Sequence, residues 1–173
     1  PYPTLFPYTT LFRSPHPVRP RGEIMNDRDW LAEAQMLSHA APRSFLFLCV
    51  ANSARSQLAE GVARMLAPKG VRVASAGSEP TSVRPEAVAV LAELGIDASG
   101  HSSTDVLSID PATVDAVITL CADEVCPVIL SDSIRVHWGL PDPAAVVGDD
   151  SERLAAFRDV RDELRRRLAV VFR

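Results

Sequence analysis

The stretch FLFLCVANSARS, from Phe45 to Ser56, decides the fold predicted for this chain. Its first six residues are all apolar, which is typical of a strand buried on both faces of a parallel sheet. The next residues are small or polar, and a helical pattern of apolar residues then runs from Ser56 to Leu66. A buried strand that turns through a short loop into a helix indicates an open α/β sheet, and such sheets bind ligands at these loops.

The rest of the chain alternates in the same way between strand-like and helix-like segments. Further strands are predicted from Val71 to Ala76, from Ala116 to Leu120 and from Ile134 to Trp138. Gly77 is expected to end the first of these strands. Further helices are predicted from Asp29 to Ser38, from Pro85 to Leu94 and from Ser151 to Phe172. In the helices, the residues expected to face the core include Trp30, Ala34, Leu37, Leu58, Val62, Met65, Phe157, Val160, Leu164 and Leu168. This alternation predicts one α/β domain with a mostly parallel sheet and helices on both faces.

The composition fits one soluble domain and excludes several classes of protein. Of the 173 residues, 47% are hydrophobic, which is enough for a sizeable core. The net charge of −4 gives no basis for nucleic-acid binding, and no apolar run is long enough to span a bilayer. Three cysteines are too few, and odd in number, for a secreted disulfide framework, so we expect a cytoplasmic protein with reactive or buried thiols.

The N-terminal residues are treated apart from the fold. The segment from Thr4 to Ser14 matches, residue for residue, the translation of a common short-read sequencing adapter, and Met25 offers a plausible start. We therefore expect residues 1–24 to be an artefactual or disordered extension; a natural proline-rich tail is the alternative. Residues 25–43 are then a helical extension, and residues 44–173 form the α/β domain.

Five residues separate Cys49 from Arg55 in the loop between the first buried strand and the next helix. A loop that curls into a helix N-terminus turns several backbone N–H groups inward, which makes a cradle for a tetrahedral anion and favours the thiolate form of a cysteine. Arg55 can bind two oxygens of such an anion, and Asn52 tolerates the left-handed backbone that a tight cradle requires. The alternative is a buried structural cysteine and a surface arginine. A nucleotide-binding P-loop is excluded, because no Gly-Lys-Ser/Thr follows.

Several motifs in order resemble the low-molecular-weight protein tyrosine phosphatase family and its arsenate reductase branch. Besides residues 49–56, they are Ser75-Ala76-Gly77, Arg84-Pro85-Glu86-Ala87, Leu94-Gly95-Ile96-Asp97, His101-Ser102-Ser103, residues 117–121, His137-Trp138-Gly139-Leu140-Pro141-Asp142-Pro143 and residues 157–163. The resemblance covers about residues 44–173 and implies a four-stranded parallel sheet with strand order 2-1-3-4. It also implies an oxyanion site formed by Val50, Ala51, Asn52, Ser53, Ala54, Arg55 and Ser56, with Cys49 as nucleophile and Asp142 as general acid.

Two further cysteines favour the reductase branch over the phosphatases. In the thioredoxin-coupled reductases that the chain resembles, one cysteine attacks arsenic, a second attacks the first sulfur, and a third draws the disulfide outward. Carried over, these roles fall on Cys49, Cys121 and Cys126. The resemblance thus implies a monomer that reduces arsenate, with phosphate and sulfate as competing anions, thioredoxin or a low-molecular-weight thiol as electron donor, and no cofactor.

Other interpretations remain open at this point. Cys121 and Cys126 could be buried structural residues of a phosphatase, or bind zinc with His137, although their spacing does not suit zinc. An arsenate–mycothiol transferase and a non-enzymatic oxyanion-binding module are further alternatives. The chain also departs from the reductase pattern: Ala51 replaces a glycine of the cradle, and the segment between Cys121 and Cys126 is short. Of the potassium ligands of some reductases, Asn52, Glu60 and Ser75 have counterparts, but Thr104 stands where an aspartate is expected.

Overall fold

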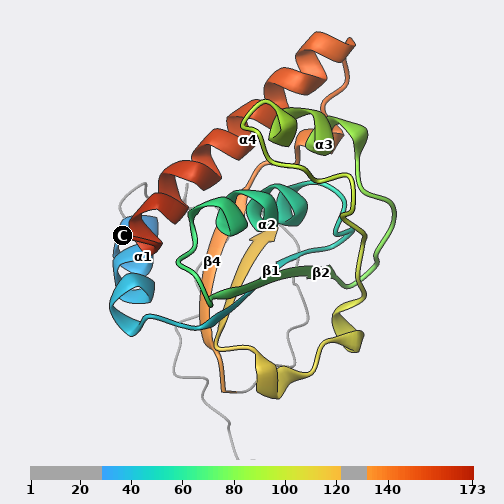
Figure 1. The fold of residues 1–173 in the computed structure, drawn as a ribbon. Helices are drawn as coiled ribbons and strands as arrows, with labels where there is room; N and C mark the ends of the chain where they lie inside the picture. Colours follow the sequence, from blue (N-terminus) through green and yellow to red (C-terminus); the bar gives the residue numbers. More distant parts are fainter. Residues whose placement is uncertain (1–28, 122–131) are drawn as a thin grey trace, which may run out of the picture.

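The computed structural model describes residues 29–121 and 132–173 (Figure 1). Four strands form one parallel sheet, in the order β2-β1-β3-β4. The strands are β1 (Ser44–Cys49), β2 (Arg72–Gly77), β3 (Ala116–Cys121) and β4 (Ile134–Leu140). This confirms the predicted sheet and its strand order. The order also puts β1 and β3 in the centre, so that the carboxyl ends of these two strands lie side by side at one end of the sheet.

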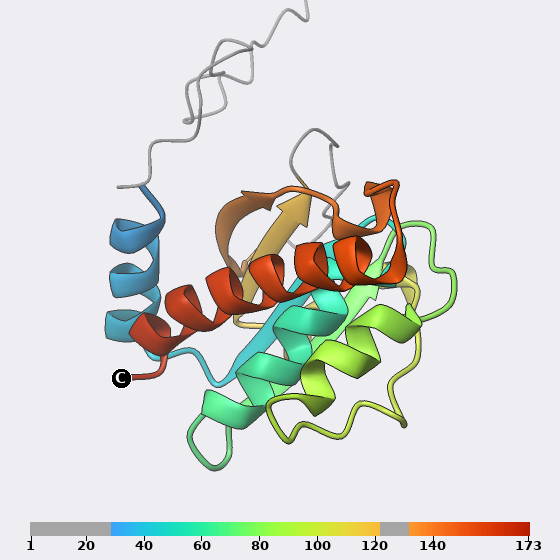
Figure 2. The same cartoon turned by 90° about the horizontal axis from the view of Figure 1, so that it is seen from above.

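Four α-helices cover the sheet: α1 (Asp29–Ala40), α2 (Arg55–Leu66), α3 (Pro85–Ala92) and α4 (Asp150–Val171). Figure 2 shows α2, α3 and α4 side by side on one side of the strands, and these three helices contact one another. The opposite face is covered by a segment with two short 3₁₀ helices, η1 (Val106–Ser108) and η2 (Pro111–Thr113). A third, η3 (Pro143–Ala145), follows β4.

The side chains of β1 alternate between two apolar clusters, because successive residues of a strand point to opposite faces. Phe45 and Phe47 pack into the large core beneath the α-helices. Leu46 and Leu48 pack against the segment that carries η1 and η2. A strand buried on both faces therefore explains the unbroken apolar run in the sequence.

The predicted core faces of the helices are confirmed with one exception. Trp30, Phe157 and the other inward residues of α1 and α4 are buried. Met65 was expected to face the core, but 42% of it is exposed. The reason is that the last turn of α2 leaves the core, with Arg64 exposed and Leu66 only partly buried.

Helix α4 is the longest of the elements that the structure describes, and neighbouring side chains cap its first turn. Asp149 and Glu152 form a reciprocal capping box, in which each side chain accepts a hydrogen bond from the backbone N–H of the other residue. The other end of α4 lies beside α1 (Figures 1 and 2). None of the helices in the described residues is both long enough and apolar enough to cross a membrane.

Candidate active site

The loop that connects β1 to α2 lies tightly against the end of β2. Cys49, the last residue of β1, is paired with Gly77, the last residue of β2. A Cβ atom at position 77 would lie 2.3 Å from the carbonyl oxygen of Val50 and 2.8 Å from the amide nitrogen of Asn52. Gly77 therefore does more than end a strand, because only a residue without a side chain lets the loop approach β2 this closely.

The carbonyl groups of this loop all have hydrogen-bond partners that hold them away from its inner side. Three N–H groups of the segment after β2 donate to them: Glu79 to Val50 at 2.9 Å, Thr81 to Ala51 at 3.0 Å and Arg84 to Ser53 at 2.9 Å. The carbonyl of Asn52 accepts from the side chains of Gln57 and Ser103. In a trans peptide the following N–H points opposite to the C=O. The N–H groups of residues 51–54 are thus directed toward one concave side, which we call the cradle.

Asn52 sits at the tightest point of the cradle. Its φ of 46° is in the left-handed region, as predicted from the residue type. The side chain is fully buried: its Oδ1 accepts from the N–H of Thr104 at 2.7 Å, and its Nδ2 donates to the hydroxyls of Ser56 and Ser75, both at 2.8 Å. These bonds fix the orientation of the amide and lock the shape of the loop.

Cys49 faces a hydroxyl that can stabilise its thiolate. The Sγ of Cys49 lies 2.8 Å from the Oγ of Ser56, in the first turn of α2. That Oγ already accepts the hydrogen bond from Asn52, so its own hydrogen is available to the sulfur. The N-terminal end of α2 adds its positive dipole at the same place. A charged sulfur at Cys49 therefore has both a donor and a favourable field.

Arg55 and Asp142 come from distant parts of the chain and meet at the cradle. Arg55 opens α2, and its side chain is only 8% exposed. Its Nη1 donates to the carbonyl of Leu140 at 3.2 Å, and its Nη2 lies 3.6 Å from the Oδ2 of Asp142. The other oxygen of Asp142 caps η3 by accepting from the N–H of Ala144. Asp142 is thus held by one oxygen, while the other faces Arg55.

Behind the cradle, a chain of polar groups leads from Asn52 to the protein surface. Ser75 donates to the Oε2 of Glu60 at 2.5 Å, and the Oε1 of Glu60 lies 2.5 Å from the Nη2 of Arg64. The potassium candidates Asn52, Glu60 and Ser75 are therefore brought together, but both oxygens of Glu60 have protein partners. In the part of the chain that the structure describes, no group of three or more His, Cys, Asp or Glu side chains could hold a metal ion.

Of the two cysteines predicted to act after Cys49, the structure describes one. Cys121 ends β3 and is 1% exposed. Because Leu48 of β1 is paired with Thr119 of β3, Cys49 and Cys121 stand at the same ends of adjacent strands. Cys126 lies outside the described residues. Burial lowers the pKa of His137, which is also hydrogen-bonded to Thr119.

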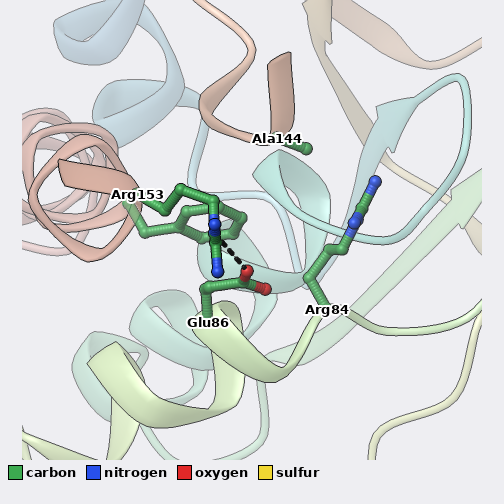
Figure 3. Close-up of a pocket in the computed structure, with 5 residues that line it drawn as sticks. Arg84, Glu86, Ala144 and Arg153 are labelled. Carbon is green, nitrogen blue, oxygen red and sulfur yellow. Dashed lines mark hydrogen bonds and ion pairs between the residues drawn. The ribbon is translucent and has the colours of Figure 1, made fainter. Parts of the chain in front are cut away.

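A cavity of about 290 Å³ lies beside the site and was not predicted from the sequence. In Figure 3, Arg84 lies on one side of it and the ion pair of Glu86 with Arg153 on the other, with Ala144 at its edge. The backbone N–H of Arg84 is bonded to the carbonyl of Ser53 in the cradle, and its side chain lines this neighbouring cavity. The motif around Arg84 was visible in the sequence, but nothing in its pattern indicated this position.

Comparison with known proteins places this geometry in context. The family model described as low molecular weight phosphotyrosine protein phosphatase matches residues 44–172. An arsenate reductase of Halalkalibacterium halodurans is 44% identical over 124 residues, which cover 70% of this chain and 89% of that protein.

Solved structures agree with the sequence matches. A structure described as an arsenate reductase in the phosphate binding state has a TM-score of 0.64 and 35% identity, and the match covers 73% of this chain and 93% of that one. Another, described as an arsenate reductase in oxidized state, has a TM-score of 0.65 and 32% identity, with coverage of 75% and 96%. The similarity thus extends over the sheet, the cradle and α4.

Proposed function

Because the chain belongs to the low molecular weight phosphotyrosine protein phosphatase family, we propose that it binds arsenate in the cradle and reduces it to arsenite. One observation carries the proposal: a cysteine, an inward-turned set of backbone N–H groups, a buried arginine and an aspartate converge at one end of the sheet. The similarity to arsenate reductases supports arsenic as the reacting centre.

The first step is nucleophilic substitution at arsenic. The Cys49 thiolate attacks As(V) and forms an As–S bond, while an arsenate oxygen leaves from the opposite side. Asp142 donates a proton to that oxygen, so that it leaves as water. Arg55 and the N–H groups of the cradle bind the remaining oxygens and stabilise their charge.

The second step supplies the electrons. Cys121, as a thiolate, attacks the sulfur of Cys49; an S–S bond forms, the As–S bond breaks, and its electron pair reduces arsenic to As(III), which leaves as arsenite. Cys126 then attacks the sulfur of Cys121, which releases Cys49 as a thiolate. The Cys121–Cys126 disulfide is reduced by an external dithiol, for which we propose thioredoxin, or by a low-molecular-weight thiol.

The setting proposed for this reaction follows from its chemistry. A disulfide relay that must be reduced after every turnover requires a reducing compartment, so we assign the protein to the cytoplasm, as a monomer without a cofactor. Phosphate and sulfate, as tetrahedral anions, compete with arsenate for the cradle. Residues 1–24 contribute nothing to the reaction, residues 25–43 form a helical extension, and the catalytic domain spans residues 44–173.

Phosphate-ester hydrolysis is a second candidate, because it needs only part of the same site. Hydrolysis requires the nucleophile, the anion-binding arginine and the acid, and water completes the cycle. Arg55 and Asp142 already lie together beside the cradle without either of the other cysteines. We therefore expect residual activity toward an aryl phosphate.

The proposal is tested by arsenate-dependent oxidation of NADPH in the presence of thioredoxin and thioredoxin reductase. The wild-type protein should consume one NADPH per arsenite formed, and Cys49→Ser should consume none. Glutathione and mycothiol systems serve as comparison donors. If arsenate causes no NADPH oxidation with any donor while an aryl phosphate is hydrolysed, the reductase proposal is wrong and the phosphatase alternative takes its place.

A further inference from the structure

The end of β4 carries two groups that hold Arg55, and the pairing of β4 with the sheet is irregular at this end. Leu140 supplies the carbonyl and Asp142 the carboxylate that contact Arg55. Within residues 29–121 and 132–173, β4 is an edge strand that pairs only with β3. Its register shifts here, because Thr119 faces His137 whereas Cys121 faces Leu140, so that β4 has one residue more than β3. Such a bulge disrupts the ladder locally before it resumes at Cys121 and Leu140, so side-chain packing contributes to the position of this end of the strand.

Trp138 is the side chain that anchors this end. It lies two residues before Leu140, so both point to the same side of the strand, and it is fully buried in the large core. The guanidinium carbon of Arg167, on α4, lies 5.8 Å from the centre of its ring. Arg167 is 8% exposed, and its Nε donates to Glu163 at 2.5 Å. Trp138, the anchor of β4, therefore packs against a buried cation, which is itself fixed by an ion pair on α4.

The same guanidinium contacts a second indole, from α1. Its carbon lies 5.4 Å from the ring centre of Trp30, and both distances are within the range of about 6 Å for cation–π attraction. The guanidinium carbon of the neighbouring Arg166 lies 4.4 Å from the same ring, so two cations of α4 contact Trp30, and Arg167 is the one that also contacts Trp138. Trp30 is 7% exposed, and α1 packs against both α4 and β4. Helix α1 precedes residues 44–172, the part of the chain that matches the family. Helix α1 therefore adds a contact from outside the part that matches the family, and through Arg167 this contact reaches the strand that ends at the active site.

We propose that Trp30, Arg167 and Trp138 form a positioning unit, through which α1 fixes the end of β4 and, by way of Leu140 and Asp142, the guanidinium of Arg55. These three are positioning residues, because none of them touches the oxyanion. Helices α1 and α4 hold the cation, and the cation contacts Trp138. Trp138 in turn fixes the positions of the Leu140 carbonyl and of the Asp142 carboxylate at the end of the strand. Figures 1 and 2 show α1 beside the C-terminal end of α4.

The alternative is that these contacts stabilise the fold and nothing more. The two roles differ in what they change in molecules that remain folded. Loss of a stabilising contact lowers the melting temperature but leaves the folded site intact. Loss of a positioning contact also displaces Arg55, and misplacement of a catalytic group by about 1 Å can cost up to about a hundredfold in rate.

The experiment compares Arg167→Met, which keeps the length of the side chain without the charge, with Arg167→Lys, which restores a cation. Arg165→Met is the matched control, because Arg165 is an exposed arginine of the same helical turn. For each variant, circular dichroism gives the melting temperature, and isothermal titration calorimetry gives the Kd for inorganic phosphate well below that temperature. Arsenate turnover, which rests on the proposed function, is measured separately.

We expect Arg167→Met to weaken phosphate binding and to slow turnover, each by about tenfold. Arg167→Lys should recover part of both losses, and Arg165→Met should match the wild type. If Arg167→Met binds phosphate as the wild type does and only its melting temperature falls, the positioning role is refuted. If Arg167→Met does not fold, Trp30→Leu decides, with weaker phosphate binding expected and an unchanged Kd as refutation. A wild-type protein that binds phosphate but does not reduce arsenate would refute the proposed function alone.

Discussion

Replacement of Asn52 should show how much of the site's stability lies in one left-handed residue. Asn52→Ala removes three buried hydrogen bonds, those with Thr104, Ser56 and Ser75. Each is worth about 1 kcal/mol net, or about 3 kcal/mol together. Alanine also lacks the tolerance of asparagine for a φ of 46°, which adds about 1 kcal/mol of strain. The free energy of unfolding should therefore fall by about 4 kcal/mol, which is a large part of the 5–15 kcal/mol typical of a domain.

Asn52→Gly is the matched control, because glycine loses the same hydrogen bonds but adopts the left-handed region without strain. Asn52→Gly should lower the free energy of unfolding by about 3 kcal/mol. The difference between the two variants then measures the strain that the positive φ imposes on alanine. Urea unfolding, followed by circular dichroism, measures both free energies. The rate at which iodoacetamide alkylates Cys49 should also fall in both variants, because Ser56 is no longer held in place to donate to the sulfur.

Two results would refute this reasoning. If Asn52→Gly were as stable as the wild type, the three hydrogen bonds would contribute nothing, and the cradle would be held by its backbone contacts alone. If Asn52→Ala and Asn52→Gly were equally unstable, the positive φ would impose no strain on alanine, and the left-handed conformation would not explain the choice of asparagine.

Three other perturbations test the site and the scaffold. Arg55→Lys should leave the fold intact but weaken phosphate binding by about thirtyfold, as for the loss of about 2 kcal/mol from a charge-assisted hydrogen bond; near wild-type calorimetry would remove Arg55 from the site. Cys121→Ser should lose arsenate reduction, measured as NADPH oxidation, yet still hydrolyse para-nitrophenyl phosphate; normal arsenate turnover would contradict the relay. Hydrogen bonds from Arg158, and to a smaller extent from Arg161, lower the pKa of the Glu93 carboxyl to about 2. The contribution of the charged carboxylate to stability is therefore present above pH 4.5 and is lost as the pH falls toward 2. The melting temperature of the wild type should therefore approach that of Glu93→Gln over this range, and a constant difference would show that the ion pairs do not stabilise the fold.

The features predicted correctly from the sequence depend on local patterns. The apolar run of β1, the positive φ of Asn52 and the inward face of α4 follow from residue types and spacing within single elements. Asp142 could be assigned to the site only through the family resemblance, because no periodicity relates it to Arg55 across the chain.

The features that could not be predicted arise from contacts between distant elements. Gly77 was expected only to end a strand, but its lack of a side chain accommodates the cradle, more than 20 residues earlier in the chain. Nothing in the sequence distinguishes Arg84 from an ordinary surface arginine, and only the hydrogen bond of its backbone to Ser53 brings it to the site. Met65 fits the helical period of the core, yet the core ends before it.

Burial explains why a relay of this kind requires a third cysteine. Cys49 is 3% exposed and Cys121 is 1% exposed, so a disulfide between them would be inaccessible to a protein reductant. Thiol–disulfide exchange requires the attacking thiolate to reach one sulfur in line with the bond. In the proposed relay the oxidised pair passes its disulfide to a third thiol, which the resemblance to the reductases assigns to Cys126. A hydrolytic cycle has no such requirement, because water is small enough to enter the cradle. The burial of Cys49 and Cys121 thus gives a physical reason for a third thiol in the proposed relay, whereas its assignment to Cys126 rests on the resemblance to the reductases.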